Sequence, residues 1–201
     1  MNDGSTRRKP KTAGEFMKEL EADPEYQAAQ AEQERELARR EAAYAAAEAP
    51  LVKALADAGV EVDSIWDLVN DPSDDYAEAV PLLEEHLKDV AYPDRVREGI
   101  ARSLSFRKAA PAWPTLVDLY RSTTDSFGLQ QGLAAAMAGT VTDDTVDELV
   151  AEARRAEHGE SRQILLLGLK RLRSPAARTA LEGLVDDPEL GENARSKLKG
   201  W

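Results

Sequence analysis

The residues of this chain best suited to acid–base or metal chemistry are two histidines and four pairs of adjacent acids. The pairs are Asp74–Asp75, Glu84–Glu85, Asp143–Asp144 and Asp186–Asp187, and the histidines are His86 and His158. Paired carboxylates could share acid and base roles, but no orienting group and oxyanion donor can be assembled around them. The acids instead suit helix starts and exposed helix faces, where they complement the helix dipole. We therefore expect no catalysis, no metal site and no cofactor, and both histidines at the surface.

The basic residues show a second pattern, which concerns binding. The first helices of four predicted pairs (76–89, 111–122, 143–157, 175–187) carry a net charge of −9, and the second helices (94–108, 126–139, 159–173, 189–199) carry +7. The candidate binding residues on the second helices are Arg95, Arg102, Arg162 and Lys170. Arginine binds carboxylates bidentately, so the pattern predicts a basic surface for an acidic partner or for the chain's own segment 25–48. Alternatively, these side chains pair with acids of neighbouring helices and stabilise the stack.

Composition narrows the class of protein. The 201 residues carry a net charge of −12, 32% of them are charged, and none is cysteine. This acidity argues against a protein that coats nucleic acid or an anionic membrane. The lack of cysteine excludes disulfides and fits a cytoplasmic protein, and no apolar run approaches the roughly 20 residues that span a bilayer. Abundant alanine, and arginine in excess of lysine, would suit a high-GC bacterial genome.

The N-terminal third differs in composition from the rest. Residues 1–12 indicate a disordered basic tail, 13–48 a polar charged helical segment, and 49–75 short helices that cap the domain beyond. The sequence predicts a helix break at Asp23–Pro24, with a new helix starting there. Residues 25–48 lack the apolar seam of a coiled coil, so we expect a solvated helix braced by pairs such as Glu36–Arg40. A partner-binding or dimerising helix and a disordered segment are the alternatives.

A repeat with a period of 33 residues organises residues 76–201. Shifting 79–104 forward by 33 places "AVPLLEEHL" over "AWPTLVDLY" and Gly99 over Gly132, and Gly168 follows after 36. Two amphipathic helices per repeat are typical of a helical solenoid. Glycine in a helix interior costs about 1 kcal/mol relative to alanine. We therefore expect each of these glycines to lie close against the first helix of its own or the next repeat.

The second helix of the first repeat carries a family resemblance. Its motif comprises Asp94, Val96, Arg97, Ile100, Ala101 and Leu104. The segment resembles the second helix of HEAT-like repeats, in particular the PBS-lyase type. The resemblance implies an all-α, right-handed α-solenoid of about four helix pairs over 76–201, with a helical N-terminal extension. It implies little about function, because packing residues define the family.

These observations favour a non-catalytic protein–protein interaction module with a repeat-built concave surface, which we expect to be a monomer. One form of it is an inhibitor or immunity-type protein that contacts a basic partner through the acidic segment 13–70. The alternative is a nucleic-acid-binding protein similar to the HEAT-like alkylpurine DNA glycosylases. Such proteins need aromatic side chains in a basic cleft, whereas the spacing of Trp113 predicts a core residue. A lyase or chaperone for a bound pigment is a third class, supported only by the repeats.

Overall fold

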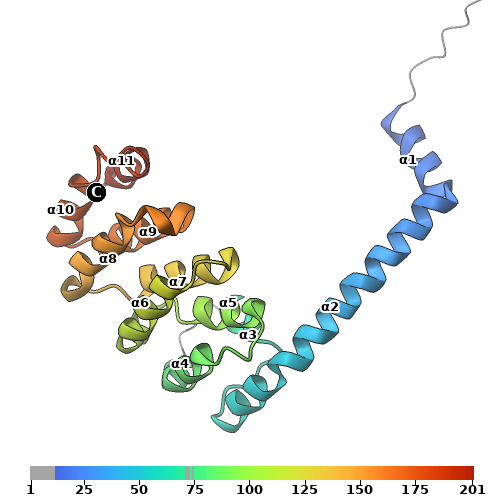
Figure 1. Ribbon diagram of the computed structural model, residues 1–201, viewed down its shortest axis with the longest axis horizontal. Coiled ribbons are helices and arrows are strands. Elements are labelled where there is room, and N and C mark those ends of the chain that lie inside the picture. Colours follow the sequence, from blue (N-terminus) through green and yellow to red (C-terminus); the bar gives the residue numbers. More distant parts are fainter. Residues whose placement is uncertain (1–11, 71–72, 74) are drawn as a thin grey trace, which may run out of the picture. The chain divides into compact units, whose positions relative to one another are not determined.

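The computed structural model describes residues 12–70, 73 and 75–201, and within these residues every assigned element is a helix (Figure 1). The chain divides into two compact units, Met1–Ala43 and Tyr44–Trp201. The all-α prediction is therefore confirmed for the described residues. Most of the predicted basic tail, 1–12, lies outside these residues, as do positions 71, 72 and 74 of the predicted segment 49–75.

The helices follow one another with short connections. In chain order they are α1 (Ala13–Ala22), α2 (Pro24–Asp57), α3 (Ile65–Asn70), α4 (Val80–Lys88), α5 (Asp94–Ser103), α6 (Trp113–Ser122), α7 (Phe127–Thr140), α8 (Val146–Ala153), α9 (Arg162–Leu172), α10 (Pro175–Glu182) and α11 (Gly191–Leu198). Four 3₁₀ turns join them: η1 (Ala77–Ala79), η2 (Arg107–Ala112), η3 (Asp143–Thr145) and η4 (Ala156–Ser161).

The first unit holds α1 and the start of α2, separated by Asp23 alone. The Asp23 carboxylate accepts a hydrogen bond from the backbone N–H of Glu25 at 2.9 Å, as the predicted helix break at this position requires. Beyond it the helix lies almost wholly in solvent and is braced along its own surface, including by the predicted pair between Glu36 and Arg40 at 3.0 Å. Such exposed pairs contribute about 0–1 kcal/mol each.

The sequence predicts separate short helices over 49–75, but the first part of this segment, including Pro50, belongs to the continuous helix α2. An interior proline loses one backbone hydrogen bond. The last turns of α2 compensate by burying Leu51 and Leu55 completely, which contributes about 1.5–3 kcal/mol for each side chain. Glu48 holds the same turns in place, since its carboxylate accepts hydrogen bonds from the Ser64 hydroxyl at 3.1 Å and the Ile65 N–H at 3.2 Å.

From α4 onward the helices form four consecutive pairs. The pairs are α4 with α5, α6 with α7, α8 with α9, and α10 with α11. The second helices also contact one another in order, α5 on α7, α7 on α9 and α9 on α11, and α3 packs on α5. We call α5, α7, α9 and α11 the second-helix row, and α4, α6, α8 and α10 the first-helix row; Figure 1 shows the two rows on opposite sides.

The predicted 33-residue repeat has a clear local counterpart at the start of the first helices. A 3₁₀ turn leads directly into α4, into α6 and into α8. In α4 and α6 the second residue is proline, Pro81 and Pro114, at a helix position where the missing N–H has no intrahelical partner to lose. The helix starts therefore repeat for a chemical reason, not only in hydrophobic spacing.

The repeated glycines do lie at close approaches, but the expected neighbour was wrong. A Cβ on Gly132 would lie 3.0 Å from the Glu98 carbonyl of α5, and one on Gly168 would lie 2.8 Å from the Ala138 Cα of α7. Each glycine thus faces the second helix of the preceding pair, not a first helix. For Gly99 the preceding element is α3, where Ile65 Cγ2 would be 2.7 Å away. The glycines allow the second helices to pack directly on one another.

The middle of the second-helix row is the most deeply buried part of the unit. Ten of the fourteen residues of α7 are buried, whereas only two of the eight residues of α11 are. Helix α7 contacts α5 and α9 on its two sides as well as its own partner α6, so it is covered from three directions and carries no charged side chain.

Candidate functional site

Two of the predicted binding residues, Arg95 and Arg102, lie on α5 and share one acid. Arg102 Nε donates to Glu98 at 2.8 Å, and Arg95 lies 3.4 Å from the other oxygen of the same carboxylate. The Arg95 guanidinium also stacks 3.7 Å above the ring of Trp66. Their charges are thus partly compensated within their own helix, while Arg95 remains exposed.

The other two predicted residues lie on α9 in different surroundings. Arg162 is only 4% exposed, so its assignment to an accessible binding surface is wrong. It donates from Nε to the Gly159 carbonyl at 2.9 Å and forms an ion pair with Glu189. Lys170 is half-buried; its ammonium donates to the Lys199 carbonyl at 3.1 Å and lies 5.5 Å from the ring centroid of Trp201. Arg162 therefore connects the segments that hold Gly159 and Glu189. Lys170 remains a candidate residue for contact with a partner.

His158 is buried, which corrects the expectation that it lies at the surface. Its Nε2 lies 3.2 Å from the carboxylate of Glu152, and its Nδ1 lies 3.3 Å from Gln130 Nε2. An amide nitrogen only donates, so Nδ1 accepts from Gln130 and Nε2 donates to Glu152. Arg121 binds the same Glu152 carboxylate at 2.7 Å. The cluster is internally satisfied, and it ties α6, α7 and α8 to the turn η4.

Tyr120 completes this cluster. Its ring lies 4.2 Å from that of His158, and its hydroxyl lies 2.7 Å from the Ser161 hydroxyl. Burial raises the pKa of Tyr120 to about 12, and the nearby Glu152 charge acts in the same direction. A phenol with this pKa stays neutral at physiological pH and cannot act there as a base.

The other residues considered from the sequence do not form a binding or metal site in the described part of the chain. Trp113 is 6% exposed and donates from Nε1 to Glu148 at 2.7 Å, so it is a core residue, as predicted, and cannot stack on a base. Within the described residues no group of three or more acids and histidines is placed to hold a metal ion. No described helix is both long and apolar enough to cross a bilayer.

Exposed large apolar side chains distinguish the two rows of helices. Phe127 on α7 is 61% exposed and Leu167 on α9 is 48% exposed. Among the described residues, the helices of the first-helix row expose no large apolar side chain to this degree, while Val90, which is 81% exposed, lies in the connection from α4 to α5. Exposed apolar groups that no neighbour covers are typical of interaction surfaces when they gather on one face.

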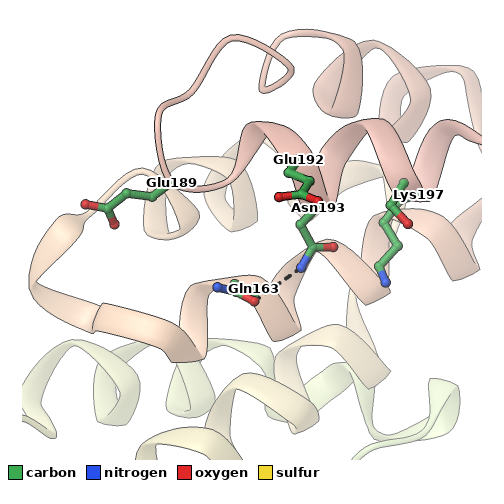
Figure 2. A pocket seen from close by; sticks show the side chains of 6 residues that line it. Gln163, Glu189, Glu192, Asn193 and Lys197 are labelled. Atoms are coloured by element: carbon green, nitrogen blue, oxygen red, sulfur yellow. Dashed lines mark hydrogen bonds between the residues drawn. The ribbon is translucent and has the colours of Figure 1, made fainter.

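A pocket of about 350 Å³ opens between α9 and α11, at the end of the second-helix row (Figure 2). Its lining residues are Gln163, Glu189, Glu192, Asn193, Ser196 and Lys197. Figure 2 shows Asn193 reaching from α11 toward Gln163 on α9, and the Asn193 amide donates to Gln163 Oε1 at 3.4 Å. The sequence prediction did not include these residues, because uncharged amides on two helices give no periodic signal. Only the spacing of 30 residues between the two helices relates them.

No protein-family model, no curated protein and no solved structure matches this chain.

Proposed function

We propose that residues 44–201 form a HEAT-like α-solenoid that binds another protein on its second-helix row and performs no catalysis. The consecutive contacts from α5 to α11 support a solenoid, because each helix pair packs only on its neighbours in such arrays. The polar last helix, with two buried residues, suits a terminal cap.

The observation that carries the proposal is the difference between the two rows. The second-helix row exposes Phe127, Leu167 and Arg95 and carries the half-buried Lys170, whereas the exposed residues of the first-helix row are charged residues, small residues and prolines. Interface centres are enriched in aromatic side chains and arginine, with polar groups at the rim. The self-satisfied cluster around His158 offers no reacting group, which is consistent with a binding role.

Photo-crosslinking in the native cell tests the proposal. A benzophenone amino acid replaces Leu167 on α9 or Gln131, a half-buried residue of α7 four positions after Phe127. The matched control carries it at Arg178, which is exposed on α10. We expect a discrete protein adduct from α7 and α9 and none from α10. Equal labelling of both rows would contradict the proposal. Adducts that nuclease treatment removes would show that the partner is a nucleic acid and not a protein.

A further inference from the structure

The groove between α9 and α11 has a regular, ladder-like geometry. Gln163 meets Asn193, and Lys170 meets the Lys199 carbonyl, so the two helices run parallel with an offset of about 30 residues. By this offset Leu167 is level with Lys197, so Leu167 and Lys170 continue the line of the pocket along α9 beyond the residues that line the pocket itself. Seven residues separate the first and last of these levels on α9, which is about 10 Å at 1.5 Å per residue. An extended chain covers that distance in about three to four residues.

The amide pair at the start of the groove is incompletely satisfied. Asn193 Oδ1 is buried and accepts no hydrogen bond, and it is the one buried side-chain polar atom of this kind in the described part of the chain. Its amide nitrogen makes a single long contact of 3.4 Å with Gln163. Turning the Asn193 amide outward would therefore sacrifice little. The two side-chain amides could then accept a hydrogen bond from one backbone N–H of an extended peptide and donate one to a backbone C=O. A helical partner has no such free groups, because its backbone N–H and C=O groups bond to each other.

The charges change along the groove. At the amide end, Glu189 forms an ion pair with Arg162, and the Glu192 carboxylate beside Asn193 also lines the pocket, so this end is acidic. Toward the other end lie Lys197 and Lys170, and neither has an ion-pair partner among the described residues. Figure 2 shows the Lys197 side chain directed toward α9, along the pocket. The unpaired cations at this end complement a carboxylate, even though the whole chain is acidic.

We propose that this groove binds an extended, acidic peptide segment of about three to four residues. Gln163 and Asn193 pair with its backbone, Leu167 contacts an apolar side chain, and Lys197 and Lys170 receive a carboxylate. This inference rests on the proposed function, since it specifies the chemistry of the protein that the second-helix row binds. Two half-buried lysines at one end contribute through position and direction more than through raw affinity.

Selection of phage-displayed random dodecapeptides on the full chain tests the proposal, followed by fluorescence anisotropy with the selected peptides. We expect peptides rich in Asp or Glu with a nearby apolar residue, and attraction that weakens with added salt. Lys197→Glu should lower their affinity at least tenfold, and Gln163→Ala several-fold. Methylation of the peptide backbone nitrogens should have a similar effect to Gln163→Ala. Arg178→Glu, an equal change of charge on exposed α10, is the matched control and should leave binding unchanged.

Three results would overturn the groove proposal. They are selected peptides without acids, binding that is insensitive to both groove variants, and affinity that survives backbone methylation. A 20-nucleotide single strand that binds wild type and loses affinity in Lys197→Glu would assign the groove to nucleic acid instead. If protein adducts still form at Gln131 and Leu167 while the groove variants change nothing, the protein-binding function stands and only the groove assignment fails.

Discussion

Replacing Gly168 by alanine tests whether direct backbone contact between second helices limits this fold. An added Cβ would lie 2.8 Å from the Ala138 Cα, 2.9 Å from the Ala138 carbonyl oxygen and 3.0 Å from a methyl of Val141. Carbon atoms in good contact are about 3.5–4.0 Å apart, so α9 must move away from α7 by several tenths of an ångström. The contact atoms of Ala138 belong to the backbone of α7, so they cannot move aside by a side-chain rotation.

Two opposing free energies decide the outcome. Alanine gains up to about 1 kcal/mol of helix propensity over glycine, while overpacking of a tight contact costs about 1–3 kcal/mol. Three short contacts, two of them with backbone atoms, place Gly168→Ala at the upper end of that cost. We expect a net loss of about 1–2 kcal/mol, or a fall in Tm of about 3–6 °C for a unit of this size.

Gly128→Ala is the matched control in the same row. The three atoms nearest its Cβ would all belong to the Glu98 side chain, the closest at 2.6 Å, and this side chain can move together with the arginines Arg95 and Arg102 that pair with it. This variant should therefore be as stable as wild type or slightly more stable. Urea denaturation followed by circular dichroism compares the two. Equal stability of both variants, or a rise in stability for Gly168→Ala, would refute the close-packing explanation of the repeated glycine.

Two further predictions concern the buried cluster around Glu152. The pKa of Tyr120 is raised to about 12, so the folded state keeps its phenol proton after the unfolded phenol has lost it near pH 10. The free energy of unfolding should therefore fall by about 2–3 kcal/mol between pH 10 and 12. Denaturation of Tyr120→Phe over this pH range should lack that part of the fall. Arg121→Met should destabilise the fold by about 3 kcal/mol, because Glu152 is 2% exposed and loses its closest cation. In the same denaturation assay Arg178→Met, which breaks an exposed ion pair, should cost at most about 1 kcal/mol.

Local chemistry made part of the fold predictable from the sequence. Helix starts depend on short-range features, so the Asp23–Pro24 break could be located from residue types alone. The repeat alignment also brought Pro81 and Pro114 to equivalent positions, although the predicted first helices began at 76 and 111, ahead of α4 and α6. The glycine at one helix position could likewise be recognised as a close approach, since nothing else offsets its cost. Which helix approaches it was not predictable, because a periodic pattern identifies a buried face without naming its neighbour.

The site was less predictable, for a related physical reason. Burial of a polar side chain depends on whether partners converge on it from other helices. Arg162 and His158 look like surface residues in sequence, yet carbonyl oxygens and Glu152 from separate elements satisfy them. In the same way, Pro50 lies within a helix because distant residues bury the turns around it. The amides of Gln163 and Asn193 become a pair only when α9 and α11 pack in parallel.

The uneven burial of α7 and α11 has a consequence for the cooperativity of unfolding. In a structure where each helix pair is held mainly by its neighbours, opening costs least at an end and most in the middle. Helix α11 is therefore expected to separate from α9 in local openings that leave α7 intact. The groove lies at that end, so the two helices that form it, α9 and α11, are expected to separate more easily than helices in the middle of the unit. Any ligand that bridges them would raise the free energy of the first opening step.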